Sequence, residues 1–400
     1  MPGARALLFE NIDPGAKRLL EEQGFSVEQV AGVVDPERLA DKLAEAELIG
    51  IRSQSQVTDG LLERCPSLLA VGAFCIGVNQ IDLPAATRRG VAVFNAPFSN
   101  TRSVVELAIA EIIALTRRLT DKNAAMHAGS WDKSATGAHE VRGRRLGIVG
   151  YGNIGIQLSV IAENLGMSVF YFDIADRLAP GNAKRCATLH ELLESVDIVT
   201  LHVDGRPENT NFFGKEEFAR MRDGAIFLNL SRGFVVDHQV LRECVESGRL
   251  AGAAIDVFPE EPSARGEPFV SELRGVANVI LTPHIGGSTE EAQVDIGRFV
   301  AHKLIDYAHA GTTTLSVNMP NVELAPRAEG NTVVHIHHNT PGVLARIDGV
   351  FAENKVNIER QALGTRADLG YVLTDLDSPC TPDMLDRLAH LDDTIRVRAL

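Results

Sequence analysis

The glycine-rich segment LGIVGYGNIG, at residues 146–155, constrains the fold of this chain more than any other feature. Its GxGxxG pattern follows an apolar run typical of a strand and opens a helical pattern over 153–165. The glycines allow a tight turn, so that a pyrophosphate group can approach the N-terminus of the helix. The next apolar run ends in Asp173, whose carboxylate would accept a hydrogen bond from an adenosine ribose and repel a 2′-phosphate. The segment therefore predicts a Rossmann domain that binds NAD; the alternative is a glycine turn that only packs a helix on a strand.

The sequence on both sides of this segment alternates between strand and helix patterns. Residues 1–100 contain short apolar runs at 6–9, 48–51, 68–72 and 91–95, separated by helical patterns. From residue 146 on, the runs LGIVG, SVFYFD, DIVTLHV, AIFLNL, GAAIDV and NVILTP are nearly continuously apolar, as strands buried on both faces require. The alternation predicts an α/β fold with two doubly wound parallel-sheet domains. We expect a flavodoxin-like, substrate-binding domain over residues 1–100 and 288–311, and the NAD-binding domain over 101–287.

Two helix starts can be placed from capping-box spacing, in which a Ser or Thr precedes a Glu by three residues. Ser103 and Glu106 have this spacing at the start of a helical pattern over 103–119. Ser288 and Glu291 have it before a second pattern that runs to about residue 310. Both helices are therefore expected to begin just after these serines.

The last part of the chain has a different order of predicted strands and helices. Residues 312–330 are rich in Thr and Pro and are expected to form a linker. After it we expect a strand over 332–338, a helix over 343–353, strands over 356–364 and 371–376, a helix over 382–391 and a strand over 394–398. This βαββαβ order is that of a ferredoxin-like unit, which predicts a third domain over residues 331–400.

Charge and cysteine content narrow the possible partners and location. The 39 Lys and Arg residues against 53 Asp and Glu give a net charge of −14, which argues against nucleic acid or an anionic membrane as the main partner. No apolar run approaches the roughly 18 residues that a membrane span needs. The five cysteines are scattered and form no CxxC pair. This pattern favours a reducing cytoplasm over a disulfide framework.

Three charged residues follow strands of the NAD-binding domain: Arg232 in NLSRGFVVD, Glu261 in DVFPEEP and His284 in LTPHIGGST. Because the carboxyl ends of parallel strands face the ligand crevice, all three can converge there. A guanidinium can hold a substrate carboxylate at two points, and a histidine can take a hydroxyl proton while hydride leaves. A carboxylate on the other ring nitrogen would fix the tautomer of the histidine and raise its pKa. Each residue could be structural by itself, but together they predict hydride transfer from a 2-hydroxy acid.

Five long motifs give the chain a family resemblance: FCIGVNQIDLPAATRRGVAVFNAPFSNTRSVVELA, LGIVGYGNIG, NLSRGFVVD, GAAIDVFPEEP and LTPHIGGSTEEAQ. It resembles the D-isomer-specific 2-hydroxyacid dehydrogenases, and within them the branch with a C-terminal ACT domain. The resemblance implies Arg232 as the carboxylate-binding residue, Glu261 as the partner of the histidine and His284 as proton donor and acceptor. It further implies cofactor contacts from Gly150, Gly152, Asn153, Ile154, Gly155, Asp173, Leu230, Ser231, Arg232, Asp256, His284, Gly286 and Gly287. One departure is the loop after LHV, where the family usually has Pro and this chain has Asp204.

For this branch the resemblance implies NAD-dependent oxidation of 3-phospho-D-glycerate to 3-phosphohydroxypyruvate, the first step of L-serine biosynthesis. Arg52 and Ser53 in GIRSQSQ match the substrate loop of the family, and Asn100 matches its cleft asparagine. Lys133 lies beside the only tryptophan, in an extended arm that resembles a dimerisation element, and is expected to help across a dimer contact. Arg52 could instead be an ordinary surface arginine.

Three other functions remain open from the sequence. The dehydrogenase core also permits a D-2-hydroxyacid reductase acting on 2-oxoglutarate, hydroxypyruvate or glyoxylate. An NAD-sensing binding protein that does not catalyse is a second alternative, against which the intact set of Arg232, Glu261 and His284 argues. Formate oxidation is disfavoured, because that subgroup pairs its histidine with a glutamine where this chain has Glu261.

The segment VVHIHHNTPGVL in the last domain places three histidines within four residues. On a strand His335 and His337 share one face while His338 points the other way, and no further set of nitrogen or sulfur ligands lies nearby, so no metal site is expected. The segment resembles ACT domains that bind amino acids, which implies His337, Asn339 and Asn357 as the site of an L-serine effector. By the same resemblance two such domains pair edge to edge in a homotetramer, a dimer of dimers that serine inhibits. The alternative is a polar strand edge that pairs with a partner subunit.

Overall fold

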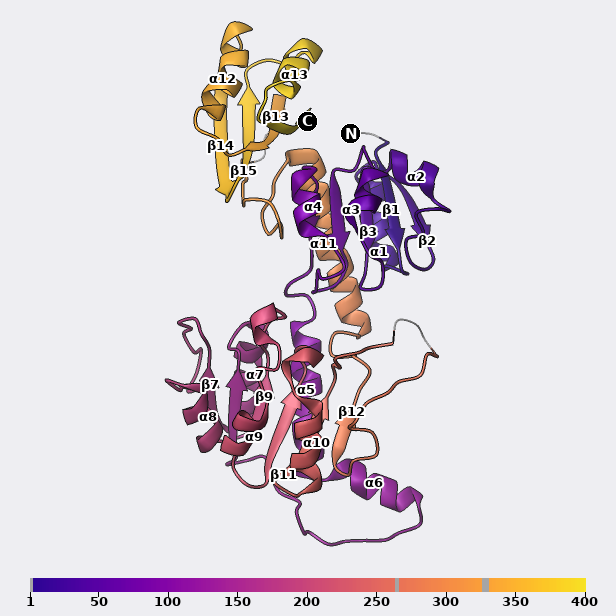
Figure 1. The fold of residues 1–400 in the computed structure, drawn as a ribbon, viewed down its shortest axis with the longest axis vertical. Helices are drawn as coiled ribbons and strands as arrows, with labels where there is room; N and C mark the ends of the chain where they lie inside the picture. The colour runs from indigo at the N-terminus through magenta and orange to yellow at the C-terminus, as the bar shows by residue number, and fades with distance from the viewer. Residues whose placement is uncertain (1–2, 263–265, 326–330) are drawn as a thin grey trace. The chain divides into compact units, whose positions relative to one another are not determined.

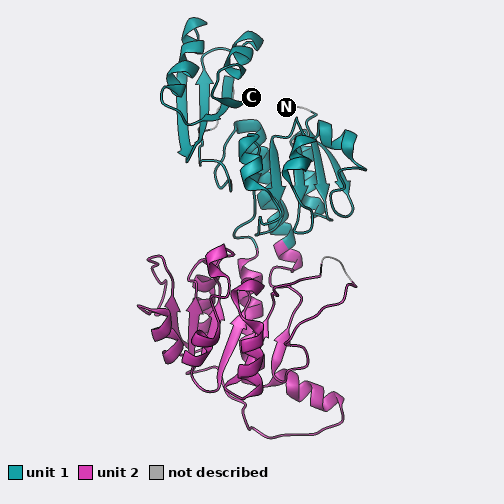
Figure 2. Cartoon of the chain, in the orientation of Figure 1, with its two compact units in different colours: residues 1–99, 293–400 teal, residues 100–292 magenta. Residues whose placement is uncertain are grey.

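The structure is a computed structural model that describes residues 3–262, 266–325 and 331–400. The chain forms two compact units, one of residues 1–99 and 293–400 and the other of residues 100–292 (Figure 2). The described parts contain no helix that is long and apolar enough to cross a membrane.

The first unit begins with a five-stranded parallel sheet (Figure 1). Its strands are β1 (Arg5–Phe9), β2 (Ser26–Val30), β3 (Leu48–Ile51), β4 (Ala70–Ala73) and β5 (Ala92–Phe94), in the order β2-β1-β3-β4-β5. Its helices are α1 (Pro14–Glu22), α2 (Ala40–Glu45), α3 (Asp59–Glu63) and α4 (Leu83–Arg88). Every residue of β3, β4 and β5 is buried, which explains their continuous apolar runs. This strand order is that of flavodoxin-like sheets, as the sequence predicted.

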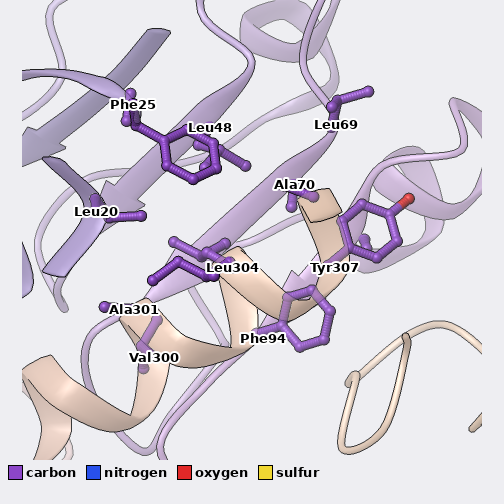
Figure 3. Close-up of a cluster of buried hydrophobic side chains, with 14 of the residues drawn as sticks. Leu20, Phe25, Leu48, Leu69, Ala70, Phe94, Val300, Ala301, Leu304 and Tyr307 are labelled. Carbon is purple, nitrogen blue, oxygen red and sulfur yellow. The ribbon is translucent and has the colours of Figure 1, made fainter. Parts of the chain in front are cut away.

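A long helix, α11 (Glu290–Ala310), covers this sheet with its residues from 293 on. Val300, Leu304 and Tyr307 of α11 are buried against strand residues such as Ala70 and Phe94 (Figure 3). The fit is close at Gly72 of β4, because a Cβ built there would lie 2.7 Å from a methyl group of Val300. The apolar stripe of this late helix thus completes a core that begins at residue 4.

The second unit holds a seven-stranded sheet in the order β12-β11-β10-β9-β6-β7-β8, parallel throughout. The strands are β6 (Arg145–Val149), β7 (Ser168–Phe172), β8 (Lys184–Arg185), β9 (Ile198–Leu201), β10 (Ala225–Asn229), β11 (Leu250–Ile255) and β12 (Val279–Leu281). Its α-helices are α5 (Thr101–Thr116), α6 (Leu119–His127), α7 (Asn153–Asn164), α8 (Leu189–Ser195), α9 (Lys215–Arg220) and α10 (His238–Glu246). Short 3-10 turns, η1 (Pro207–Asn209) and η2 (Gly233–Val235), follow β9 and β10. The doubly wound sheet predicted around the glycine-rich segment is confirmed.

The C-terminal residues of the first unit form the expected ferredoxin-like βαββαβ unit. In chain order its elements are β13 (Asn331–His338), α12 (Val343–Glu353), β14 (Ile358–Arg366), β15 (Leu369–Leu376), α13 (Pro382–Ala389) and β16 (Thr394–Ala399). The sheet is antiparallel, in the order β14-β15-β13-β16. Val333 of β13 packs with the side chains of α12 and α13, whereas its neighbour Val334 belongs to the larger core of the unit. Odd-numbered residues of β13 therefore face the helices.

Both capping boxes were placed wrongly. The helix expected from Ser103 begins at Thr101 instead, and the side chain of Glu106 pairs with Arg102 at 2.6 Å. At the start of α11 the hydroxyl of Thr289, not of Ser288, accepts a hydrogen bond from the N–H of Ala292.

The first half of the expected linker is packed against the sheet of the first unit. The Asn318 side chain accepts a hydrogen bond from the N–H of Val93 at 2.8 Å and donates to the carbonyl of Val91 at 2.9 Å. Thr313 is fully buried and bonded to Pro320 and Val322. Residues 326–330 of the expected linker lie outside the described part of the chain.

Candidate active site

The glycine-rich turn lies between β6 and α7, as the sequence predicted. Gly150 has φ 91°, and a Cβ there would lie 2.5 Å from the carbonyl oxygen of His202. Gly155 lies close to the carbonyl of Gly150, whereas a Cβ on Gly152 would meet nothing within 4 Å. Gly150 and Gly155 therefore keep the turn tight, and Gly152 leaves open space at the start of α7, which Asn153 and Ile154 begin. This cradle fits the pyrophosphate of a dinucleotide.

Asp173 follows β7 and faces the turn. Its carboxylate accepts hydrogen bonds from the N–H of Tyr151 and of Ala175, both at 2.7 Å. The negative charge is thus held beside the glycine-rich turn by two backbone donors. A carboxylate in this position suits a ribose with free hydroxyl groups and disfavours a 2′-phosphate.

His202 directly follows β9, beside the glycine-rich turn. Its Nε2 lies 3.0 Å from the hydroxyl of Thr200, and burial lowers the pKa of the imidazole to about 4. The residue is therefore a neutral, structural histidine.

His284 and Glu261 form a hydrogen-bonded pair in the second unit. His284 Nδ1 lies 2.8 Å from Glu261 Oε2, and Glu261 Oε1 accepts a hydrogen bond from the N–H of Phe258 at 3.0 Å. Burial alone would raise the pKa of Glu261, but the hydrogen bonds from His284 and Phe258, with the charges of His284 and Arg232, lower it overall. The carboxyl is therefore ionised, so Nδ1 carries the proton and donates it. The other ring nitrogen, Nε2, remains for a substrate.

The hydrogen bond to Glu261 raises the pKa of His284 above its ordinary value, against the opposing effect of burial. The charge of Asp256 adds to the rise and that of Arg232 reduces it. Arg232 thus acts electrostatically on both members of the pair, and the three residues that the sequence singled out are brought together. A base with a raised pKa, an orienting carboxylate and a guanidinium are suited to proton transfer beside an anionic substrate.

Arg232 is placed by tight packing on two sides. Its guanidinium donates to the carbonyl of Ser231 at 2.7 Å, and Gly205 lies against the aliphatic part of its side chain. The next residue, Gly233, has no room for a side chain, because a Cβ there would lie 1.9 Å from the carbonyl carbon of Phe258. Leu230 and Ser231 are buried, and the Ser231 hydroxyl donates to Asn229 at 2.7 Å.

Asp256 is 1% exposed and holds the loop that carries His284. Its carboxylate accepts hydrogen bonds from the Thr282 hydroxyl at 2.6 Å and from the N–H groups of Ile285 and Gly286 at 2.8 Å. The cofactor contact that the family resemblance implies for Asp256 stays a prediction. The structure adds a second task, support of the loop, which a sequence pattern does not reveal.

Asn100 lies at the N-terminus of α5. A Cβ built on Gly287 would lie 2.4 Å from the amide nitrogen of Asn100, which is the group nearest to it. Gly286 contacts Asp256 in the same way, at 3.0 Å. Both glycines therefore let the loop after His284 approach its neighbours closely. Asn100 is thus held next to the loop that carries His284, within the same unit.

Arg52 and Ser53 follow β3 in the first unit. The Arg52 N–H donates to Glu10 Oε1 at 3.1 Å and its carbonyl accepts a hydrogen bond from Gln80 at 2.7 Å. Among the described residues, the guanidinium of Arg52 and the backbone and hydroxyl of Ser53 have no protein partner. Both residues are left available for a ligand. Sequence reasoning missed Glu10, whose only signal is an acidic residue directly after a buried strand.

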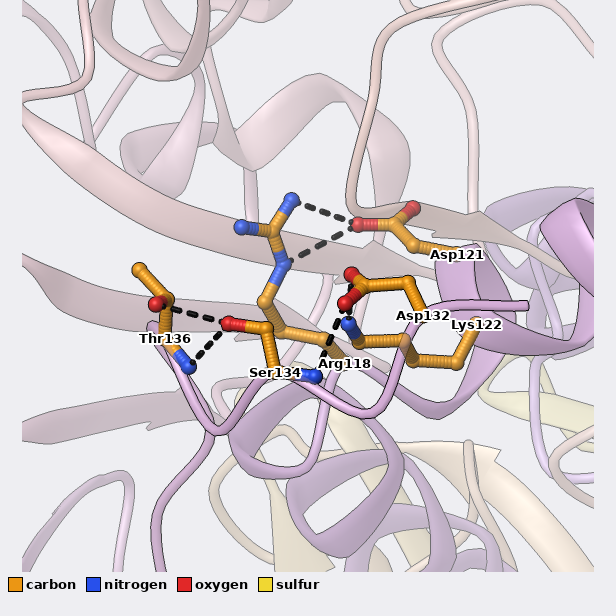
Figure 4. Close-up of polar contacts among 6 residues, drawn as sticks. All are labelled: Arg118, Asp121, Lys122, Asp132, Ser134 and Thr136. Carbon is orange, nitrogen blue, oxygen red and sulfur yellow. Dashed lines mark hydrogen bonds and ion pairs between the residues drawn. The ribbon is translucent and has the colours of Figure 1, made fainter. Parts of the chain in front are cut away.

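Lys133 lies in an exposed arm, remote from Asn100. The arm follows α6, and its base is held by ion pairs of Arg118 with Asp121 and of Lys122 with Asp132 (Figure 4). It returns to the C-terminal end of α5, where Thr116 accepts the N–H of His139. Asn100 is at the other end of this 16-residue helix, roughly 24 Å away. One chain therefore does not bring Lys133 to the loop of His284.

The three histidines of β13 differ in their surroundings. His335 and His337 are buried with their rings 5.9 Å apart, and His338 is exposed. His335 Nε2 lies 2.7 Å from the hydroxyl of Thr394, and burial, with a smaller effect of His337, lowers its pKa to about 3. His337 Nδ1 donates to the carbonyl of His338 at 2.9 Å, which leaves its buried Nε2 without a partner. No group of three metal-binding side chains occurs in the described ranges.

The predicted effector residues lie at two ends of this domain. The side chain of His337 packs on Gly370, and the N–H of Asn339 donates to Asp368, so both belong to the end of the sheet near the β14–β15 turn. Asn357 precedes β14 and donates to Asp377, just after the opposite end of β15. Strand β15 has eight residues, which separates the two ends by roughly 25 Å. A single domain cannot bring all three side chains to one small ligand.

Comparison with known proteins agrees with this geometry. Residues 109–286 match the family model "D-isomer specific 2-hydroxyacid dehydrogenase, NAD binding domain", and residues 333–396 match "AHAS small subunit-like ACT domain". A solved structure from Thermus thermophilus, the TT0316 protein, covers 76% of this chain and 96% of its own at 28% identity, with a TM-score of 0.68. The structure of D-2-hydroxyisocaproate dehydrogenase has the same fold, with a TM-score of 0.72 over 79% of this chain and 100% of its own, at 24% identity.

Two relatives match almost end to end. The D-3-phosphoglycerate dehydrogenase of Haemophilus influenzae is 47% identical over 98% of this chain and 96% of its own. That of Escherichia coli K12 is 46% identical over 98% and 97%. The chain belongs to the D-isomer-specific 2-hydroxyacid dehydrogenase family and is an NAD-dependent oxidoreductase. Within that family its place is among the D-3-phosphoglycerate dehydrogenases with a C-terminal ACT domain.

Proposed function

We propose that this chain catalyses the NAD-dependent oxidation of 3-phospho-D-glycerate to 3-phosphohydroxypyruvate, the first step of L-serine biosynthesis. The observation that carries the proposal is the 2.8 Å hydrogen bond between His284 and Glu261, under the influence of Arg232. Relatives named for this activity and matched over nearly their whole length support the choice of substrate.

The residues divide the chemical work. Bound NAD⁺ supplies the hydride acceptor. Arg232 binds the substrate carboxylate, whose planar shape suits two-point binding by a guanidinium. His284 Nε2 takes the proton of the C2 hydroxyl, a role worth roughly 10² to 10⁴ in rate. Glu261 keeps Nδ1 protonated, so that Nε2 is the basic nitrogen, and stabilises the positive charge that forms on the ring.

The cofactor is held by the turn from Gly150 to Gly155 and by Asp173. Further contacts are proposed from Leu230, Ser231, Asp256, Gly286 and Gly287, on the basis of the family resemblance. For the substrate, we propose that Arg52 and Ser53 bind its phosphate end and that Asn100 adds a hydrogen bond. Support comes from the unpartnered guanidinium of Arg52 and from the place of Asn100 beside the loop of His284.

The C-terminal domain is proposed to bind L-serine and to inhibit the enzyme. Because His337 and Asn339 lie at one end of its sheet and Asn357 at the other, we propose that a site combines the first two from one chain with Asn357 from a second. Antiparallel pairing of two β14 edges brings these ends together, since it places the start of one strand beside the end of the other. β14 is an edge strand of the four-stranded sheet.

A second contact between chains is proposed at the arm that contains Lys133. Trp131 in this arm is 72% exposed, and α6 before it has no buried residue. With the pairing of the C-terminal domains, this contact gives a dimer of dimers, in which Lys133 reaches the active site of a neighbouring chain. The five unbridged cysteines are in keeping with a cytoplasmic location.

The test is NADH production from 3-phospho-D-glycerate, with and without added L-serine. The His284→Ala variant is the blank, because it should lose turnover while it still binds NADH. Wild-type protein without activity on 3-phospho-D-glycerate, but active on 2-oxoglutarate, hydroxypyruvate or glyoxylate, would favour the alternative reductase. Activity that is insensitive to serine would remove only the regulatory part of the proposal.

A further inference from the structure

The carboxylate of Glu10 is buried where the chain leaves β1. The residue is 7% exposed and has φ 58°, in the left-handed region that a glutamate rarely adopts. Asn11, the next residue, has φ 52°. Among the described residues Glu10 forms no ion pair with a Lys, Arg or His side chain. A buried, ionised carboxylate without a cation is costly unless several hydrogen bonds replace its water.

The hydrogen bonds come from the loop that follows β3. Glu10 Oε1 accepts the N–H of Arg52 at 3.1 Å and that of Ser55 at 2.8 Å, and Oε2 accepts the N–H of Gln54 at 3.0 Å. One carboxylate therefore fixes the backbone at three of four consecutive residues. Gln80 holds the same loop from its other side, by donating to the carbonyl of Arg52 at 2.7 Å.

The fourth residue of this loop, Ser53, does not contribute a hydrogen bond to the carboxylate. Its N–H does not donate to Glu10, and the residue is exposed. The loop thus turns three N–H groups onto the buried carboxylate and leaves one N–H, together with the Ser53 hydroxyl and the Arg52 guanidinium, for solvent or a ligand. These are three donors, one of them positively charged, on consecutive residues, which suits a tetrahedral dianion such as a phosphate ester.

We propose that Glu10 is a positioning residue for the phosphate group of the substrate. It does not touch the substrate but holds the loop of residues 52–55 in the conformation that presents Arg52 and Ser53. Glu10 thereby sets the preference of the enzyme for a phosphorylated over an unphosphorylated acid. The inference rests on the proposed function, because it assigns the loop to the phosphate of 3-phosphohydroxypyruvate.

The test compares Glu10→Gln with wild type in the reductive direction, using NADH with 3-phosphohydroxypyruvate or with hydroxypyruvate. A glutamine keeps the size of the side chain, but its NH₂ group cannot accept an N–H, so part of the loop is released. We expect KM for 3-phosphohydroxypyruvate to rise about tenfold, equivalent to about 1.4 kcal/mol of binding. We expect kcat and KM for NADH to stay within about twofold, and kcat/KM for hydroxypyruvate likewise, since that substrate has no phosphate.

Two controls separate positioning from general damage. Glu22→Gln, on the exposed end of α1, makes the same chemical change without a loop to release and should behave as wild type. Arg52→Ala should show the loss of phosphate preference directly. The double variant of Glu10→Gln and Arg52→Ala should then lose little more than Arg52→Ala alone, because both changes act on one interaction. If the Glu10→Gln protein does not fold, Glu10→Asp, which keeps the charge one methylene shorter, is measured in the same way.

An unchanged KM for 3-phosphohydroxypyruvate, or an equal loss of kcat/KM for both substrates, would overturn the role of Glu10. So would fully additive effects in the double variant. Failure of wild-type protein to reduce 3-phosphohydroxypyruvate would instead overturn the proposed function, which keeps the two outcomes distinct.

Discussion

His284 combines an uncommon backbone conformation with a restrained side chain. Its φ is 53°, and its N–H donates to the carbonyls of Asp256 at 2.8 Å and of Thr282 at 3.0 Å. A residue is held in this region only where its surroundings determine it, and such residues concentrate at functional sites. With Glu261 holding Nδ1, the ring is oriented before a substrate arrives. The proton-transfer geometry is therefore built into the folded chain.

Replacing Glu261 by Gln should move the pH dependence of catalysis. The loss of the carboxylate lowers the pKa of His284, because the hydrogen bond that His284 donates to Glu261 is the main cause of its rise. Oxidation needs the neutral ring, so the acidic limb of kcat/KM for 3-phospho-D-glycerate should shift to lower pH. The plateau should fall by about 10 to 10³ fold, since the histidine becomes a weaker and less well oriented base. Reduction needs the protonated ring, and its basic limb should shift to lower pH as well.

The matched control is Glu260→Gln, which changes the neighbouring exposed carboxylate. Its profiles should coincide with those of wild type in both directions. A Glu261→Gln profile that keeps the wild-type limbs would show that the pair does not set the pKa that controls turnover.

Glu111 is a buried acid in the middle of α5, and among the described residues neither of its carboxyl oxygens has a hydrogen-bond partner. Burial, and to a lesser degree the charge of Asp256, raise its pKa from 4.5 to about 8. Its folded form therefore keeps a proton that the unfolded form loses above pH 4.5. The contribution of protonated Glu111 to the free energy of unfolding is therefore fully present below pH 4.5 and declines as the pH rises to about 8.

The Glu111→Gln variant, which cannot ionise, should escape this decline. Its free energy of unfolding relative to wild type should increase by up to about 1.4 kcal/mol per pH unit between pH 4.5 and 8 and then level off. Urea unfolding of both proteins across this range measures the difference. Glu106→Gln, on the exposed side of the same helix, should show no such slope. A constant difference between Glu111→Gln and wild type would mean that Glu111 is already ionised at neutral pH.

At the scale of single residues, the sequence could identify site residues that lie after the end of a strand. Arg232, Glu261 and His284 each lie in a loop that follows a strand of one parallel sheet, so their convergence could be predicted from topology alone. Glu10 also directly follows a strand, but its role depends on hydrogen bonds to a loop distant in sequence, which the strand end does not reveal. The role of Glu111 depends on its burial within a helix, for which a lone glutamate gives no signal.

The loops after β10 and β11 are fitted to each other through a single glycine. Gly233 begins η2 directly after Arg232, and the backbone of Phe258 and Pro259 occupies the position of the missing side chain. The same Phe258 donates its N–H to Glu261. The residue that binds the carboxylate and the residue that orients the histidine are therefore linked through backbone contact between two loops.

Replacing Gly233 by Ala should separate these loops. A Cβ 1.9 Å from the carbonyl carbon of Phe258 cannot be accommodated without a shift of one backbone, and the Glu261–His284 hydrogen bond should be lost. We expect kcat to fall by about 10² fold or more, in the range of losing an oriented general base. NADH binding, measured by fluorescence titration, should weaken less than kcat falls, because the glycine-rich turn and Asp173 lie elsewhere in the unit.

A suitable comparison is Gly60→Ala in α3, where a Cβ would meet only the Thr58 hydroxyl, at 4.0 Å. That variant should retain wild-type turnover. If Gly233→Ala also retained it, the backbone contact between the loops would have no part in placing Glu261.

Strands were predicted more accurately than helix starts. The nearly continuous apolar runs predicted six strands of the parallel sheet, β6, β7 and β9 to β12, with small shifts at their ends. The two-residue strand β8 is exposed and was not predicted. Helix starts depend on which of several neighbouring cap residues is used. At α11 the hydroxyl that caps the helix belongs to Thr289, one residue after the predicted Ser288. Helix α5 begins at Thr101, although Ser103 has the capping-box spacing. Packing of the helix body decides between such candidates.

At the scale of the whole molecule, a single C-terminal domain cannot form the proposed effector site. Residues that one ligand would need lie at opposite ends of its sheet, and β14 is left as an open edge. The family resemblance named His337, Asn339 and Asn357 and implied a site between two paired domains. The strand register adds that one domain cannot bring all three side chains to one ligand. Regulation by serine, if it uses these residues, is then a property of the assembled protein.

Combining two variants that serine no longer inhibits tests this arrangement. Under pairing by a two-fold axis, each interface contains two sites, each with His337 of one chain and Asn357 of the other. His337→Ala and Asn357→Ala should each abolish inhibition by serine, since every site loses one residue. In a pair formed from one chain of each kind, both changes fall in the same site and the other site is intact. Co-expression with two affinity tags should therefore yield a mixed enzyme that serine inhibits, with about half the binding sites of wild type by calorimetry. A site built within one chain would give no such recovery, because both kinds of chain would carry a damaged site.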